Sequence, residues 1–327
     1  MEQPLSFTVG KHELFGVLHR PDAAGSERPE VAVLFVHSGS RGRLGCTFHY
    51  PYMARRLVRM GYPVLRYDPP GIGDSTGSIE LGPTDDFYGS IQSGRYIGDT
   101  LAAIEELRRL VAPRSIVLLG VCGGAITALG TAALAEGVAG VALLSVPVML
   151  DFSRQELAER IPTHYARKYL WSLYSRKMLS AAAWWRLLTL QSDVGLMRTY
   201  LTAALRRVRR HRGDGSPAGA GKLKLNPSFG PWLSALCRRQ RRTLFIFGDD
   251  DRFRWEFERE FYDRHWRSTP SYEELCTVRR IAHCNHMLTM REWQDQAVDL
   301  VAAWLKTLRP AVERGAARAS AELRAPG

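Results

Sequence analysis

The sequence has 327 residues, of which 45% are apolar and 24% charged, and these values predict a soluble globular protein with a large core, as one domain or as a domain with an insertion. It contains no run of 18 or more uncharged apolar residues, and its first twenty residues lack the apolar stretch of a secretory signal, which argues against a membrane span and against secretion. Its net charge of +12 is concentrated in one middle segment. Its five cysteines are too scattered for a disulfide framework, and we therefore expect a cytoplasmic protein.

The first 145 residues alternate between strand-like and helix-like patterns. Residues 5–19 alternate apolar and polar positions around a turn at residues 10 and 11, which predicts an antiparallel hairpin. Residues 31–36 are continuously apolar and precede helical spacing over residues 52–60, the pattern of a buried parallel strand and its helix. The fold class predicted from this alternation is α/β, with a doubly wound, mostly parallel sheet. Further strands are expected at 64–67, 115–119 and 138–145, with helices at 96–110 and 125–135.

The alternation stops at Pro147 and resumes about a hundred residues later. Residues 150–240 contain no strand-like run, only amphipathic segments rich in Trp, Leu and Arg, which predict an inserted helical cap. Strand patterns return at 243–247 and 278–282, and a last amphipathic helix is expected over 293–308. The predicted organisation is therefore a core of residues 1–149 and 241–308, a cap of residues 150–240 and a flexible tail of residues 309–327.

The basic charge lies mainly in this predicted cap. Between residues 151 and 224 there are fifteen Lys or Arg residues and five Asp or Glu residues. The excess is compatible with a solvated helical surface, with peripheral contact to an anionic membrane, or with a substrate carried by coenzyme A or by a carrier protein. Nucleic acid is disfavoured because no base-reading motif accompanies the charge. Residues considered for the acyl pocket or for phosphate contacts, without assignment to the site, are Trp171, Trp184, Trp185, Leu187, Arg206, Arg207, Arg209 and Arg210.

Cys122 is the candidate nucleophile. It lies in Gly120-Val121-Cys122-Gly123-Gly124, directly after an apolar strand and directly before an Ala-rich helix. Glycines two residues before and two after the cysteine allow the sharp turn that exposes a nucleophile. The N-terminal end of the helix is expected to favour the thiolate, which is the reactive form of cysteine. Taken alone, the five residues are also compatible with a small buried cysteine near glycines.

An acid and a histidine follow at later strand ends, in the chain order of a nucleophile, an acid and a histidine. The strand at 243–247 ends in three aspartates, of which we select Asp251, with Asp250 as the alternative. The strand at 278–282 leads to His286, with His283 as the alternative. His286 is expected to take the thiol proton, and the acid to orient its imidazole. A metal site at these histidines is disfavoured because no second ligand cluster of suitable spacing accompanies them.

The loop after the first parallel strand is the candidate for a second oxyanion donor. It reads His37-Ser38-Gly39-Ser40-Arg41-Gly42. A backbone N–H of Gly39, or of Ser38, is expected to join that of Gly123 against the oxygen that becomes negative during acyl transfer. Alone, this segment is simply a glycine-rich loop.

Together with the Asp68-x-x-Gly71-x-Gly73-x-Ser75 loop, these motifs resemble the α/β-hydrolase superfamily, over nearly the whole chain apart from the tail. The turn around Cys122 at residues 120–124, which we call the elbow, and the basic cap are more weakly similar to the hydrolases associated with exosortase A polysaccharide systems. Dienelactone hydrolases also have a cysteine elbow, but they are compact and lack such a cap. The cysteine departs from the serine of most of the superfamily, which puts simple carboxylesterase activity in doubt.

The glycines at 71 and 73 could instead indicate a dinucleotide-binding loop. Thr76 stands where that motif needs glycine or alanine, and the first strand of the core does not carry the motif, so we predict no nicotinamide cofactor and no other. The sequence therefore predicts an acyl hydrolase or thioesterase acting on a small acyl substrate. An acyltransferase with the same thioester intermediate is the alternative, and a catalytically silent binding protein is the second alternative.

Overall fold

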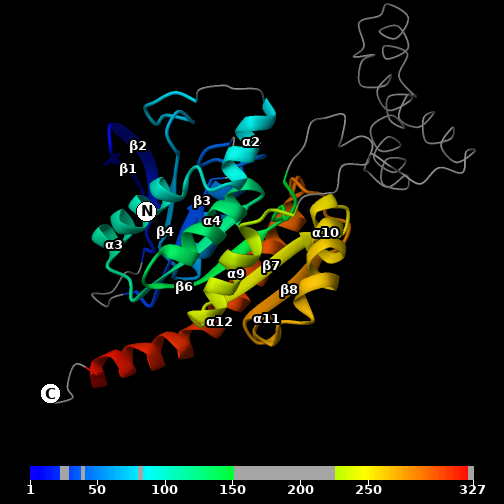
Figure 1. Cartoon of the computed structure of the whole chain (residues 1–327). Helices are drawn as coiled ribbons and strands as arrows, with labels where there is room; N and C mark the ends of the chain where they lie inside the picture. The colour runs from blue at the N-terminus through cyan, green and yellow to red at the C-terminus, as the bar shows by residue number, and fades with distance from the viewer. Residues whose placement is uncertain (23–28, 38–40, 80–83, 151–224, 323–327) are drawn as a thin grey trace, which may run out of the picture. The chain divides into compact units, whose positions relative to one another are not determined.

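The computed structural model describes residues 1–22, 29–37, 41–79, 84–150 and 225–322. The chain divides into two compact units, Met1–Leu150 with Leu223–Gly327, and Asp151–Lys222. The first unit is the α/β domain predicted from the sequence (Figure 1). The residues considered for the acyl pocket and for phosphate contacts, from Trp171 to Arg210, lie outside the described residues.

An eight-stranded sheet forms the centre of this unit, in the order β1-β2-β4-β3-β5-β6-β7-β8. The hairpin of β1 and β2 and the β2–β4 pair are antiparallel, and all other pairs are parallel, which confirms the predicted sheet type. Most of the parallel strands are buried because their side chains face helices on both sides, whereas the strand at the edge, residues 276–281, has exposed side chains at Arg279 and Arg280. The strands are β1 (Glu2–Val9), β2 (His12–His19), β3 (Val31–Val36), β4 (Val64–Tyr67), β5 (Ser115–Val121), β6 (Val138–Leu144), β7 (Arg242–Gly248) and β8 (Cys276–Ile281).

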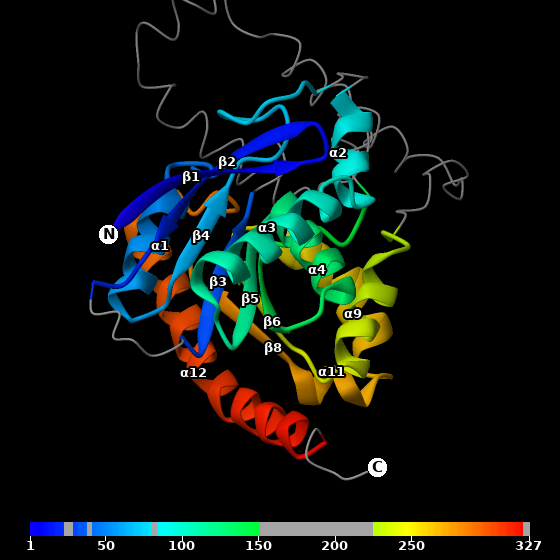
Figure 2. The ribbon, with the colours of Figure 1, turned by 90° about the vertical axis from the view of Figure 1, so that its left-hand side faces the viewer.

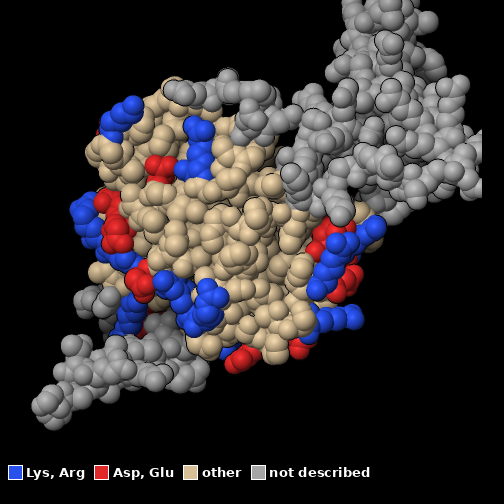
Figure 3. Space-filling view, viewed as in Figure 1, with Lys and Arg blue, Asp and Glu red and all other residues tan. Residues whose placement is uncertain are grey.

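Helices cover both faces of the sheet, as the turned view shows (Figure 2). One hydrophobic core joins the sheet to α1 (His49–Arg59) and α12 (Arg291–Glu322). The other core lies against α2 (Thr84–Gln92), α3 (Ile97–Val111), α4 (Gly123–Leu134) and α9 (Phe229–Arg238). This second core also contains side chains of α10 (Arg252–Glu256), the π-helix η1 (Phe257–Trp266) and α11 (Pro270–Leu275). Charged side chains on the face seen in Figure 3 lie mainly at its margins, and the middle is uncharged.

The second part of the core begins earlier than the sequence analysis predicted. Residues 225–240 were assigned to the insertion, but α9 packs on α4 because Phe229, Leu233 and Leu236 are buried in the shared core. The chain returns beside the point where it leaves: Met149 and Leu225 form an antiparallel bridge, and the amide of Asn226 donates to Val148 at 2.8 Å. Leu225–Arg241 thus belongs with the sheet domain rather than with the insertion.

The C-terminal segment also differs from the prediction. Residues 309–327 were expected to be a loose tail, whereas the backbone of α12 stays helical to Glu322. None of the helices in the described part of the chain is long and apolar enough to cross a membrane.

Candidate active site

Cys122 forms a sharp turn between β5 and α4. Its backbone has φ 56° and ψ −122°, a conformation that costs free energy in any residue other than glycine. The amide of Cys122 donates to Leu144 of β6 at 2.9 Å, and its carbonyl accepts from Ala125 in the first turn of α4. The residue is partly exposed, so a substrate can reach this turn.

The two outer glycines of the turn are required by close backbone contacts. A Cβ on Gly120 would lie 2.2 Å from the carbonyl oxygen of Gly124. A Cβ on Gly124 would lie 2.5 Å from the carbonyl oxygen of Val36 and 2.3 Å from that of His37. Both contacts are with backbone, which cannot rotate away as a side chain can. The glycine spacing recognised in the sequence is therefore the spacing at which α4 touches both β5 and the end of β3.

Asp251 and His286 come together at the ends of β7 and β8. Both carboxylate oxygens of Asp251 lie 3.3 Å from Nδ1 of His286. The Asp251 side chain is fully buried, whereas 29% of the His286 side chain is exposed. The Phe253 ring packs edge-on against the imidazole, with 4.7 Å between the ring centres. The nearby Cys122 contributes, after Asp251, to the raised pKa of this imidazole. Because Nδ1 faces the carboxylate, Nε2 is the ring nitrogen left for a second partner.

The acid is held by hydrogen bonds with Phe253 and His286. Burial alone would raise the pKa of Asp251, but hydrogen bonds from His286, from the Ser145 hydroxyl and from the Phe253 amide outweigh burial and keep the pKa below its ordinary value. The Phe253 amide donates at 3.0 Å and makes Asp251 the N-cap of α10. Ser145 follows β6 with a positive φ of 50° and is almost fully buried.

The pKa of His286 is shifted in the opposite direction, upwards. Burial disfavours its protonation, but the hydrogen bonds and negative charges of Asp251 and Cys122 outweigh burial and raise the pKa of His286 well above its ordinary value. An imidazole with a raised pKa can hold a proton beside sulfur and deliver it to a departing group.

The structure discriminates between the alternatives that the sequence left open. Asp250 is exposed, and its amide donates to the carbonyl of Cys284 at 2.9 Å. His283 is also exposed. Asp251 and His286 are the members of each pair that contact each other.

Of the two candidate oxyanion donors, Gly123 lies within the residues that the structure describes and Gly39 does not. Gly123 is the first residue of α4 and is partly exposed, and the first amides of a helix have no partner within the helix. Gly39 and Ser38 lie outside the described residues, so the second donor stays a prediction.

The Asp68 motif has a structural role. The buried carboxylate of Asp68 accepts a hydrogen bond from the Arg43 amide at 2.6 Å, pairs with the Arg43 guanidinium and accepts the amide of Asp74 at 3.1 Å. A Cβ on Gly73 would lie 2.1 Å from this carboxylate, which explains the glycine. The Ser75 hydroxyl donates to the Asp68 carbonyl at 2.8 Å. The motif thus holds Arg43, which lies between β3 and α1, against the turn that follows β4.

Two residues near the site were missed in the sequence. Ser145 stands at a strand end, the same signal that identified Asp251 and His286, and could have been considered. Tyr50 is buried in α1, and nothing in its helical pattern distinguishes it from an ordinary core residue.

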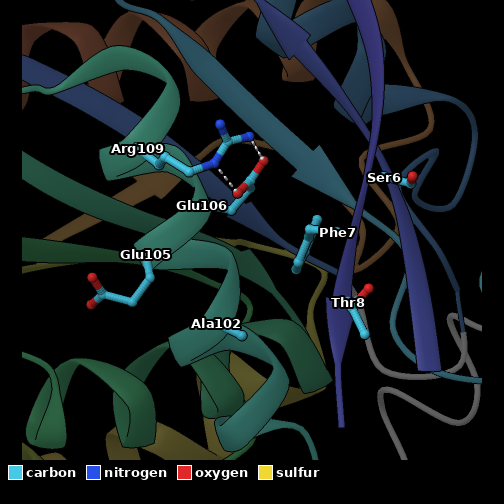
Figure 4. Close-up of a pocket in the computed structure, with 7 residues that line it drawn as sticks. All are labelled: Ser6, Phe7, Thr8, Ala102, Glu105, Glu106 and Arg109. Atoms are coloured by element: carbon cyan, nitrogen blue, oxygen red, sulfur yellow. Dashed lines mark hydrogen bonds and ion pairs between the residues drawn. The ribbon is translucent and has the colours of Figure 1, made fainter. Parts of the chain in front are cut away.

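A hollow of about 520 Å³ lies elsewhere, between β1 and α3 (Figure 4). It contains an ion pair between Glu106 and Arg109 at 2.7 Å. None of its lining residues belongs to the elbow, the acid loop or the histidine loop, so it is not part of the candidate site. Among the described side chains, no group of three or more His, Cys, Asp or Glu could hold a metal ion.

Comparison with known proteins supports the same fold. A model of the alpha/beta hydrolase family matches residues 33–304. The esterase Pf2001 of Pyrococcus furiosus is similar, with a TM-score of 0.55 and 15% identity over 94% of this chain and 91% of the esterase. The proline iminopeptidase of Mycobacterium smegmatis is similar with a TM-score of 0.54 and 16% identity, over 94% of this chain and 99% of the peptidase. Est1E of Butyrivibrio proteoclasticus, solved with ferulic acid bound, is similar with a TM-score of 0.51 and 14% identity, over 93% of this chain and 98% of Est1E.

No curated protein matches the sequence. At these identities the solved structures establish the fold and nothing finer. The family model, in contrast, spans well over half of the residues, including the elbow, the acid and the histidine. The chain belongs to the alpha/beta hydrolase family.

Proposed function

We propose that the protein is an acyl hydrolase or thioesterase that works through a covalent acyl-cysteine at Cys122. The observation that carries the proposal is the pair of His286 with the buried carboxylate of Asp251, together with the raised pKa of His286, to which the nearby Cys122 contributes. This is the arrangement by which a base activates a nucleophile while a third group orients the base.

The proposed acylation begins with the Cys122 sulfur paired with a protonated His286. The sulfur attacks the carbonyl carbon of the substrate. The oxygen of the tetrahedral intermediate accepts hydrogen bonds from the Gly123 amide and from a second donor. The carbon–leaving-group bond then breaks, and the proton on His286 goes to the leaving group. The product of this half-reaction is a thioester at Cys122 and a neutral His286.

The proposed deacylation uses the same groups in reverse. Neutral His286 takes a proton from water as the water oxygen attacks the thioester carbon. The carbon–sulfur bond breaks, the carboxylic acid leaves, and the thiolate is again paired with protonated His286. Asp251 keeps the imidazole in the tautomer whose Nε2 faces the sulfur, and stays ionised throughout.

Transfer to an acceptor is the close alternative. A thioester reacts more readily with amines and thiols than an oxygen ester does, so an acceptor could replace water in the second half-reaction. The substrate on either account is a small molecule carrying an acyl group, with coenzyme A or a carrier protein as candidate carriers. Product analysis with and without an added amine distinguishes the two, because transfer gives the amide and hydrolysis gives only the acid.

The test of the proposal is loss of turnover in Cys122→Ala, measured with 4-nitrophenyl acetate and with acetyl-coenzyme A. The matched control is Cys46→Ala, because Cys46 is the other partly exposed cysteine among the described residues. We expect turnover to vanish in Cys122→Ala and to persist in the control. Unchanged turnover in Cys122→Ala would refute the covalent mechanism.

A silent binding protein makes a different prediction for the free enzyme. If Cys122 is activated by His286, it reacts with iodoacetamide at about pH 6, where an ordinary thiol is scarcely ionised. Labelling confined to high pH, together with absent turnover of every acyl probe, would favour the binding protein.

A further inference from the structure

Tyr50 lies in the first turn of α1, and its hydroxyl connects β3 to the residue before Cys122. The hydroxyl donates a hydrogen bond to the carbonyl of Val36, the last residue of β3, at 2.7 Å. It accepts a hydrogen bond from the amide of Val121, the last residue of β5, at 3.0 Å. The side chain is fully buried, and burial raises the pKa of Tyr50, so the hydroxyl stays a neutral donor and acceptor.

The register of the two strands shows what this hydroxyl replaces. β3 and β5 are parallel, and their last aligned pair is Val36 opposite Gly120. In a parallel ladder of this register, the next hydrogen bond would run directly from the Val121 amide to the Val36 carbonyl. The structure instead has the amide, the hydroxyl and the carbonyl in series. Tyr50 is therefore a spacer inserted into the final rung between these two strands.

The spacer is adjacent to the elbow on both sides. Val121 immediately precedes Cys122, whose φ of 56° begins the turn. The same Val36 carbonyl faces Gly124 so closely that a Cβ there would lie 2.5 Å away. The hydroxyl thus sets the separation between the end of β3 and the two ends of the elbow.

The ring of Tyr50 is itself held in place. The Phe35 ring packs against it at 5.2 Å between ring centres, and the His49 ring packs edge-on at 4.6 Å. Such packing leaves the hydroxyl little freedom to follow a shifting strand.

We propose that Tyr50 is a positioning residue for acyl transfer: its hydroxyl holds β3 and β5 apart at the elbow and so fixes the attack geometry of Cys122 and the Gly123 amide. This rests on the function proposed above. Without the hydroxyl, the Val121 amide and the Val36 carbonyl can close into an ordinary rung, so neither group stays unpaired. The strands then approach each other, and the elbow moves with them.

Loss of the Tyr50 hydroxyl should affect the rate of acyl transfer more than it affects the stability of the fold. A displacement of the order of 1 Å in a catalytic group costs up to about 100-fold in rate, so Tyr50→Phe should lower kcat about 10- to 100-fold with KM little changed. Alkylation of Cys122 by iodoacetamide needs no oxyanion donor, so its rate should fall much less than kcat. Because the final rung can close, the thermal midpoint should fall little.

The experiment compares the full-length wild type, Tyr50→Phe and Tyr272→Phe. Tyr272 is a matched control: it is buried, its hydroxyl is hydrogen-bonded to Ser234 at 2.8 Å, and it lies in α11, away from the elbow. For each protein we would measure kcat and KM with 4-nitrophenyl acetate, the iodoacetamide rate at Cys122 and the thermal midpoint. Incorporation of 3-fluorotyrosine at position 50, which keeps the hydroxyl, should restore kcat.

A selective fall in kcat for Tyr50→Phe, absent in Tyr272→Phe, is the expected result. An unchanged kcat, or alkylation that falls in parallel with kcat, would overturn the inference. If Tyr50→Phe does not fold, Phe35→Leu takes its place, because it removes the ring that packs on Tyr50 and so shifts a hydroxyl that is still present. A selective fall in kcat is again the expected result, and an unchanged kcat or a parallel fall in alkylation would overturn the inference. A wild type that forms no acyl-cysteine would instead be a failure of the proposed function.

Discussion

The imidazole of His286 lies against the fully buried carboxylate of Asp251, with Nδ1 3.3 Å from each carboxylate oxygen. Burial opposes a charge on both groups, yet the pKa of His286 is raised and that of Asp251 is lowered. Each group therefore stabilises the charged form of the other, and Ser145 and Phe253 add hydrogen bonds to the acid. In the mechanism that we propose, the Cys122 thiol uses this pair.

Asp251→Asn should lower kcat about 100- to 10,000-fold, because an amide no longer stabilises the imidazolium and can favour the wrong tautomer. Asp250→Asn is the matched control, since Asp250 is adjacent in sequence but exposed. Steady-state kinetics on both variants checks the assignment. Equal losses in the two variants, or a larger loss in Asp250→Asn, would contradict it.

Gly124→Ala should abolish activity and destabilise the fold by about 2 kcal/mol or more, because the new Cβ meets the backbone carbonyls of Val36 and His37, which cannot move aside. Gly98→Ala is the control: it also lies in a helix, but a Cβ there meets nothing within 4 Å. That substitution should stabilise the protein by about 0.5 to 1 kcal/mol. Urea unfolding and turnover measure both effects, and a well-folded, active Gly124→Ala would refute the packing argument.

His49 should make the protein sensitive to acid. Burial, together with the nearby His286, lowers the pKa of His49 from 6.5 to about 4, so the folded protein resists a proton that the unfolded chain accepts. The titration of His49 therefore leaves the free energy of unfolding unchanged above about pH 6.5 and lowers it as the pH drops from there towards 4. At pH 5 the loss amounts to about 2 kcal/mol.

His49→Leu removes this titration and leaves others, such as that of His19, in place. The unfolding free energy of the variant relative to wild type should therefore rise by about 2 kcal/mol between pH 7 and pH 5. Urea unfolding at the two pH values gives this difference. A constant difference would show that His49 titrates normally in the folded protein.

The strands and their order of alternation were predictable because a buried parallel strand is a largely continuous apolar run, as at 31–36 and 115–119, where the structure has β3 and β5. Residues 252–275 gave no such signal: their pattern mixes Arg, Glu and aromatic residues, and they form α10, the π-helix η1 and α11. The helix α9 was assigned to the insertion because an amphipathic pattern shows that a face is buried but not against which layer.

The candidate site was predictable to the extent that its residues lie at strand ends. Cys122, Asp251 and His286 each follow a parallel strand, and the carboxyl ends of such strands share one edge of the sheet. Tyr50 could not be found in this way, because its position between β3 and β5 follows from how α1 packs on the sheet. Ser145 helps to lower the pKa of Asp251, an effect that depends on how the ends of β6 and β7 meet in the folded chain.

The central claim is that Cys122 carries the acyl group. Acid quenching of the wild type during turnover of 4-nitrophenyl acetate, followed by proteolysis and mass spectrometry, tests this claim directly. The account predicts one acetyl group on the peptide that contains Cys122, lost on treatment with neutral hydroxylamine as a thioester is, and absent from Cys122→Ala. An acetyl group confined to a serine or another residue while turnover continues would contradict it.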